Sequence, residues 1–468
     1  MSDDLPAYSG AQSQQHPSAA ARRELVSHEV HIEDGKGSPW FTLKLRSRAR
    51  DAKFVPEFWE GDTITGSVEL DLQKPDAIVA ITVSIMGVAI LPKWASGPSL
   101  HFHRETYTLW RAEQDDLNPP GFNPSAVSST PASKKSLKLV GQYTFPFSFK
   151  LPREVTYTLP KTIAHKAGDD GTPKTYRMPP TCEDVGGQFS IYYHLEVHVQ
   201  RGRFRIDTRL NQHFVYHPKS QPSPPSELRQ LVYQENADAL IGPMGDRDGW
   251  LDVDAITVNG MLFGKQKVQV RCTLSLAKPL CYTRSTPIPL SLRIQCEDDT
   301  ALDLFAQPEA PRVCLIRRQT CNPRVQGNVN EADKSTDASY LVIKDILAEA
   351  SWWPDRGAHN AANERALQGE IKIPVDVRPT TYFAILSITY AVVVQPFSVP
   401  GFSPEPSTSD RKSILTPTIP TLSSSEVEIA TSYANGPRPK AFTPPGYDAL
   451  RKVAPDRTNL GIYGSGGL

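Results

Sequence analysis

Residues 58–90 constrain the fold of this chain more than any other stretch. Within residues 64–72 the even positions are apolar apart from Gly66, whereas polar side chains fill the odd positions. A strict period of two is typical of a strand with one buried and one solvated face. Lys-Pro-Asp at residues 74–76 then supplies turn chemistry, and a β-branched run follows over residues 78–90. The segment predicts two strands joined by a tight turn, as in a hairpin.

The same alternation recurs along the chain. Apolar side chains take the odd positions in residues 141–152 and again in residues 189–199. Further strands are predicted at residues 267–276, 288–296, 313–316, 340–346, 371–377 and 382–394. The last run is apolar on both faces, which is typical of a central buried strand. Many short strands, abundant turn residues and little helical periodicity indicate an all-β chain built from two immunoglobulin-like β-sandwiches.

Composition divides the chain into five parts. Both ends are polar or rich in Pro and Ser, so disordered amino- and carboxy-terminal tails are predicted. The predicted order is a tail at 1–25, a sandwich at 26–217, a linker at 218–245 with a short helix, a second sandwich at 246–420 and a tail at 421–468. The position of the last strand of the second sandwich stays open, with residues 414–419 as one candidate.

The charge balance and the cysteines exclude several classes of protein. Fifty-one Lys and Arg residues balance 51 Asp and Glu residues, so a nucleic-acid partner is not expected. Six cysteines occur without a C-x-x-C pair, which predicts neither a zinc site nor a disulfide framework. No P-loop, G-x-S-x-G or G-x-G-x-x-G motif is present. We therefore expect no enzyme activity, no metal and no cofactor.

The sequence predicts a cytoplasmic protein. Its amino terminus lacks the basic start and apolar core of a secretory signal. The most apolar run, residues 382–394, is shorter than the roughly 20 residues that span a bilayer.

Several of these segments together resemble the arrestin-like proteins, and specifically the α-arrestins. The resemblance rests on Gly61-Asp62-Thr63, the G-x-V-x-L-x-L strand at 66–72, the Lys-Pro turn and the blocks at 141–152 and 187–199. It covers residues 40–216 and, more loosely, residues 248–394. It implies two sandwiches in the arrestin arrangement.

A proline motif lies near the carboxy terminus, at Thr443-Pro444-Pro445-Gly446-Tyr447. Two prolines favour a polyproline II ridge that docks into an aromatic groove, and Tyr447 can fill a neighbouring pocket. PPxY is the ligand of WW domains, so Pro444, Pro445 and Tyr447 are the predicted WW contacts. The alternative is a stray proline pair, because the chain contains 42 prolines.

Two further stretches are candidate binding sites. Leu5, Pro6 and Tyr8 resemble the LPxY variant of the WW ligand, and two motifs on one chain could bind tandem WW domains with avidity. Arg201, Arg203 and Arg205 recur at every second position, which could gather positive charge against a phosphorylated cargo tail or anionic lipid. The alternatives are an ordinary polar terminus for the first and a solvated basic strand edge for the second.

The resemblance implies a trafficking adaptor. Such proteins bind membrane transporters or receptors and recruit a WW-domain HECT-type ubiquitin ligase through PPxY, so that the cargo is ubiquitinated and internalised. Recruitment to the plasma membrane or endosomes would follow. The alternative is a retromer-like double-sandwich scaffold, which has no need of the PPGY motif. Cargo, ligase, modified lysines, phosphorylation sites and oligomeric state are not indicated by the sequence.

Overall fold

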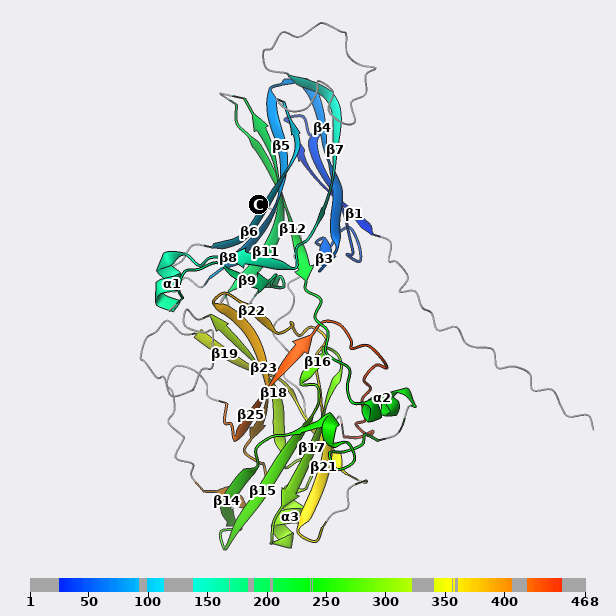
Figure 1. Cartoon of the computed structure of the whole chain (residues 1–468), viewed down its shortest axis with the longest axis vertical. Helices are drawn as coiled ribbons and strands as arrows, with labels where there is room; N and C mark the ends of the chain where they lie inside the picture. The colour runs from blue at the N-terminus through cyan, green and yellow to red at the C-terminus, as the bar shows by residue number, and fades with distance from the viewer. Residues whose placement is uncertain are drawn as a thin grey trace, which may run out of the picture.

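The structure is a computed structural model. It describes residues 25–91, 99–112, 138–167, 169–183, 189–202, 205–235, 237, 239–321, 341–355, 357, 361–405 and 419–447. Two β-sandwiches lie end to end, with the amino-terminal one at the top of Figure 1. The predicted all-β class with two sandwiches is confirmed. Within the described ranges, no helix is long and apolar enough to cross a membrane.

The first sandwich contains two main sheets. One contains, in spatial order, β1 (Val26–Glu33), β2 (Pro39–Ser47), β4 (Thr63–Asp76) and β7 (Leu139–Lys150). The other contains β3 (Glu57–Trp59), β12 (Thr208–His217), β11 (Ser190–Arg201), β5 (Ile78–Ile90) and β6 (Leu100–Arg111), with β10 (Cys182–Glu183) beside β11. A small sheet of β8 (Glu154–Tyr157) and β9 (Lys174–Arg177), joined through α1 (Lys161–Ala167), lies at the end facing the second sandwich (Figure 1).

The predicted parity of β4 is confirmed, but the predicted hairpin is wrong. Ile64 and Val68 are fully buried, and Val68 lies opposite Phe145 of β7 in the register. However, β4 pairs with β2 and β7, whereas β5 pairs with β6 and β11. The chain therefore crosses from one sheet to the other at Ala77. Both strands turn an apolar face into the space between the sheets, which is why alternation alone could not tell a hairpin from a crossing.

The second sandwich also has two sheets. One contains, in spatial order, β20 (Ser351–Pro354), β21 (Glu364–Lys372), β17 (Pro287–Gln295), β15 (Gln266–Ala277), β14 (Ile256–Leu262) and β24 (Phe402–Pro404), with β13 (Trp250–Asp252) beside β15. The other contains β16 (Cys281–Thr283), β25 (Ser423–Ala430), β23 (Leu386–Gln395), β18 (Arg312–Cys321) and β19 (Leu341–Glu349), with β22 (Thr381–Phe383) beside β23. The short helix α3 (Asp299–Phe305) packs against the first of these sheets.

Two predictions for this sandwich are wrong. The apolar run at 382–394 is not one strand, because Ala384 and Ile385 form a turn between β22 and the central strand β23. Residues 414–418 of the candidate position for the last strand lie outside the described residues, and within the described part the last strand is β25, which pairs with β23. The predicted domain boundary at residue 420 therefore falls before the final strand, not after it.

The β22–β23 turn joins the two sandwiches. Phe383 is 1% exposed, and its ring centroid lies 4.7 Å from that of Phe102 and 5.3 Å from that of Tyr176. Both partners belong to the first sandwich, on β6 and β9. The ring centroid of Tyr157, on β8, lies 6.1 Å from that of Phe383. An aromatic side chain of the second sandwich is thus inserted into a socket of the first.

His217, at the end of β12, is a half-buried histidine whose side chain is 24% exposed. Its ring lies 4.7 Å from that of Trp59, and Nε2 lies 3.9 Å from a carboxylate oxygen of Glu57. Burial, followed by the positive charge of Arg284, lowers the pKa of His217 to about 4.

We expect acid to destabilise the fold through His217. Below pH 6.5 the unfolded chain protonates this histidine, while the folded protein does so only near pH 4, so the free energy of unfolding falls as pH drops through this window. Urea unfolding should show a loss of about 1–2 kcal/mol from this residue between pH 7 and pH 5. His217→Gln should remove it. The control His165→Gln alters an exposed histidine, and an equal pH slope in all three proteins would contradict the prediction.

Candidate functional site

The chain beyond β25 lies against the linker that enters the second sandwich. Thr431 Oγ1 accepts a hydrogen bond from the Ser220 amide at 2.9 Å, and the amide of Ser432 donates to the Ser220 carbonyl at 2.8 Å. Further along, Gln221 Nε2 donates to Asn435 Oδ1 at 3.0 Å. The prediction of a disordered tail from residue 421 is therefore wrong for residues 421–447. Residues 448–468 lie outside the described part of the chain.

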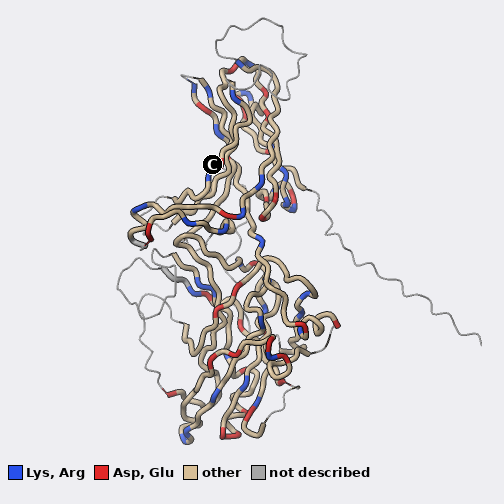
Figure 2. The backbone as a smooth tube through the Cα atoms, in the orientation of Figure 1, with Lys and Arg blue, Asp and Glu red and all other residues tan. Residues whose placement is uncertain are grey.

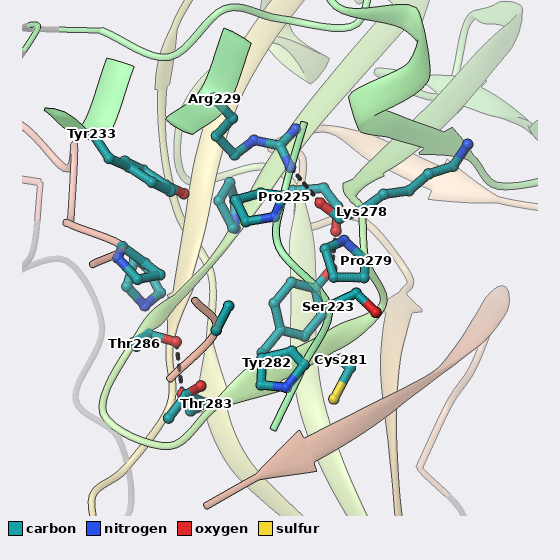
Figure 3. A pocket seen from close by; sticks show the side chains of 16 residues that line it. Ser223, Pro225, Arg229, Tyr233, Lys278, Pro279, Cys281, Tyr282, Thr283 and Thr286 are labelled. Atoms are coloured by element: carbon teal, nitrogen blue, oxygen red, sulfur yellow. Dashed lines mark hydrogen bonds between the residues drawn. The ribbon is translucent and has the colours of Figure 1, made fainter. Parts of the chain in front are cut away.

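The linker contains a helix that is anchored to the second sandwich by one arginine. Helix α2 (Glu227–Gln234) falls where the sequence predicts a short helix, and the Ser226 side chain caps it by accepting from the Arg229 amide. The Arg229 side chain is 2% exposed. Its guanidinium donates to the Lys278 carbonyl at 2.6 Å (Figure 3). It also donates to the Gly249 carbonyl at 2.6 Å and lies over the Trp250 ring at 4.9 Å. The 3₁₀ turn η3 (Arg247–Gly249) completes this anchor.

A small cavity lies beside this anchor. Figure 3 shows Arg229 and Tyr233 of α2 on one side, and Lys278 and Pro279 of the β15–β16 connection with Tyr282 of β16 on the other. Ala434 and Pro439 of the carboxy-terminal segment add a third wall. The cavity volume of about 50 Å³ is far below the several hundred Å³ that a small-molecule site requires. The cavity is thus a seam where linker, sandwich and tail meet.

Phe442 fixes the tail to the sandwich beyond this seam. Its side chain is 8% exposed and packs in a cluster with Val232, Tyr233, Leu240, Trp250, Ala277 and Trp353. Its ring stacks on that of Tyr233, with centroids 6.1 Å apart. Tyr447 is half-buried and packs against the same cluster. The tail therefore contributes two aromatic side chains to an apolar surface of the second sandwich.

A buried carboxylate holds the backbone of the same segment. Glu370 of β21 is 4% exposed. Its Oε1 accepts from the Phe442 amide at 2.7 Å, and its Oε2 accepts from the Thr443 hydroxyl at 2.8 Å and the Thr443 amide at 3.2 Å. Hydrogen bonds to a charged acceptor are stronger than neutral ones, and a buried carboxylate requires them. Glu370 thus depends on the tail for these three donors.

The PPGY motif itself forms a turn. The Tyr447 amide donates to the Pro444 carbonyl at 3.2 Å, and Gly446 has a φ of +95°. Proline at the second position and a glycine with positive φ at the third are the requirements of a type II turn. Pro445 and Gly446 are exposed, whereas Pro444 and Tyr447 are half-buried. All three predicted WW contacts are therefore gathered on one side of the second sandwich.

The predicted arginine stripe lies elsewhere, and one carboxylate partly neutralises its two described arginines. Arg201 Nε and Arg205 Nη1 donate to the two carboxylate oxygens of Asp76, at 2.8 and 3.1 Å. Arg201 also stacks over the Trp40 ring at 5.2 Å. Arg203 lies outside the described residues. Anion binding by these arginines stays a prediction, and it would require Asp76 to release them.

The other predicted ligand, Leu5-Pro6-Ala7-Tyr8, lies outside the described residues. Acidic and basic residues are interspersed over both sandwiches, as expected from the neutral balance (Figure 2).

Sequence reasoning missed Phe442 and Glu370. Phe442 directly precedes the motif that was singled out, and it is the only bulky apolar side chain between Tyr433 and Tyr447. That isolation is a weak signal of an anchor. The sequence contains no signal for Glu370, because this residue lies 72 residues before Phe442 and only the fold brings the two together.

Comparison with known families supports the resemblance of the first sandwich to an arrestin amino-terminal domain. Residues 52–221 match the family model described as "Arrestin (or S-antigen), N-terminal domain". The match runs from just before β3 to just beyond β12. Among curated proteins, no match to this chain was found. The resemblance to arrestin-like proteins is thus confirmed for residues 52–221. The looser resemblance of residues 248–394 and the α-arrestin subtype stay predictions.

Proposed function

We propose that this protein is an arrestin-like trafficking adaptor that links membrane cargo to a WW-domain HECT-type ubiquitin ligase. The first sandwich is an arrestin-like domain, and a second sandwich contacts it through the ring of Phe383. The observation that carries the proposal is the PPGY motif at 444–447, on a segment that the second sandwich holds in place. A purely structural double sandwich has no use for such a segment.

The proposed mechanism is proximity. Cargo, either a transporter or a receptor, binds the sandwich body, and the ligase binds Pro444, Pro445 and Tyr447. The ligase then works at a raised effective concentration near the cargo lysines, and the adaptor performs no chemistry itself. The adaptor would act in the cytoplasm, at the plasma membrane or at endosomes, where anionic lipid can add to cargo binding. A second ligand at Leu5, Pro6 and Tyr8 would let tandem WW domains bind with avidity.

We expect Tyr447→Ala to abolish most of the WW binding. A single short motif binds with roughly micromolar affinity, and the tyrosine ring fills one of its two pockets, so the dissociation constant should rise at least about tenfold. The measurement is a calorimetric titration of tandem WW domains into the full-length protein. Tyr433→Ala, which removes a 37% exposed tyrosine of the same tail, is the matched control and should bind as the parent does.

Two outcomes would contradict the proposal. Equal binding by the parent and Tyr447→Ala would show that WW domains use another motif, and Tyr8→Ala would then be tested in the same way. No binding by either protein, nor by a free peptide of residues 436–450, would favour the retromer-like scaffold.

A further inference from the structure

We infer that Thr443 is a phosphorylation site whose modification releases the PPGY segment from the second sandwich, so that docking on Glu370 and WW binding are alternative states. This inference rests on the proposed function for its biological meaning. Its structural basis is independent, since it concerns how residues 442–447 are held and what would expel them.

The docked state places the motif where a WW domain cannot grip all of it. Tyr447 packs against the cluster that contains Tyr233 and Phe442, so part of its ring is covered. Pro445 can keep polyproline II angles at the second position of the turn, but Gly446 leaves that form with a φ of +95°, and Tyr447 beyond it packs against the sandwich. A WW domain must therefore bind a released form of the segment.

The Thr443 hydroxyl is the group whose modification would disrupt the docked state. It donates to Glu370 Oε2 at 2.8 Å, and the carboxylate that receives it is 4% exposed. In the sequence, Pro444 directly follows Thr443, and proline-directed protein kinases accept a Thr-Pro pair of this kind. Because Thr443 is itself half-buried, the kinase would act on the fraction of molecules in which the segment is transiently undocked.

Phosphorylation would reverse the sign of this contact. Thr443 Oγ1 attacks the γ-phosphorus of ATP, the bond to the β-phosphate oxygen breaks, ADP leaves and the hydroxyl proton passes to the kinase base. The product has lost its donor to Glu370 and carries a charge of about −1.5 to −2 at neutral pH. The phosphate would then face the Glu370 carboxylate, which is 4% exposed, and two like charges at this distance repel each other strongly. The segment leaves and carries Phe442 with it.

The expected effect follows from the occupancy of the released state. The apparent affinity for a WW domain is reduced by the fraction of molecules whose segment is docked. If about nine in ten are docked, release strengthens WW binding roughly tenfold.

The test uses full-length protein that carries phosphothreonine at position 443. Calorimetric titration with tandem WW domains should give about tenfold tighter binding than to the unmodified protein. Trypsin gives a second readout, because Lys440 lies two residues before Phe442 and cleavage after it should become faster on release. Phosphothreonine at the exposed Thr421 is the matched control and should change neither readout.

Two variants separate charge from the loss of a hydrogen bond. Thr443→Val keeps the shape of the side chain but removes its donor, so WW binding should tighten by a smaller factor than with the phosphate. Glu370→Gln keeps the size of the side chain and removes its charge. In that variant, phosphorylation of Thr443 should have a much smaller effect on WW binding.

The free peptide of residues 436–450 distinguishes failure of this inference from failure of the proposed function. If neither the peptide nor its phosphorylated form binds WW domains, the ligase-recruiting function fails. If the peptide binds and the unmodified full-length protein binds equally well, the segment is not masked and the inference is overturned. An unchanged rate of cleavage after Lys440 in the phosphorylated protein would overturn it as well.

Discussion

Arg229→Met is expected to lower the free energy of unfolding by about 3 kcal/mol. Methionine keeps most of the apolar stem but removes two hydrogen bonds to the carbonyls of Lys278 and Gly249. It also leaves the carboxylate of Asp246, which is 5% exposed, without the guanidinium 3.9 Å away. Removing one member of such a buried group costs about 3–5 kcal/mol, and Asp246 keeps its bonds from Ser226 and Gly249. The lower end of that range therefore applies.

Chemical denaturation of the full-length protein measures this effect. Gln234→Met makes the matched substitution at an exposed position of the same helix and should change stability by less than about 0.5 kcal/mol. Arg229→Lys should recover only part of the loss, because an ammonium cannot reproduce the two-pronged donation. If Arg229→Met were as stable as the parent, α2 would not depend on this anchor.

Phe383→Ala is expected to cost about 3–4 kcal/mol and to uncouple the two sandwiches. The side chain is 1% exposed and its partners Phe102, Tyr157 and Tyr176 all lie in the other sandwich. Truncating a buried phenylalanine loses its transfer free energy and leaves a cavity, which together cost about 3–5 kcal/mol. Because the cavity would lie between the two sandwiches, the sandwiches can move apart instead of enclosing an empty space.

The uncoupling has its own signature. Denaturation of Phe383→Ala should change from one cooperative transition towards two, and small-angle scattering should show a larger spread of distances between the sandwiches. Tyr382→Ala is the control, since the adjacent ring is 60% exposed. A single transition at the parent's midpoint for Phe383→Ala would show that the sandwiches are held together by other contacts.

The strands were predictable because their signal is local. The alternation around Val68 and Phe145 requires no knowledge of partners, since burial of one face imposes it. Strand β25 was missed because three serines occupy its first half, and only Val427 and Ile429 mark its inner face. The crossing at Ala77 was missed because alternation reports which face is buried, not which sheet the strand joins.

The candidate site was predictable only in part. PPGY is a contiguous motif, so its position could be read directly, together with its chemistry. The anchors at Phe442 and Glu370 are long-range partners, and a proline-rich tail is typical of disorder whether or not it docks. The same limit applies to Arg201, whose partner Asp76 lies 125 residues earlier.

The hydrogen bonds between Ser220 and Thr431 determine how far the PPGY motif can reach from the second sandwich. They fix the point from which the tail departs, beside the place where the chain enters the second sandwich. While Phe442 is docked, Pro444 is held at one place on the second sandwich, and so is any partner bound to it. Once the segment is free, the 13 Cα–Cα steps from Thr431 to Pro444 can extend to about 45 Å. The same motif can then occupy many positions around the point where the tail departs, instead of the single position that it has while Phe442 is docked.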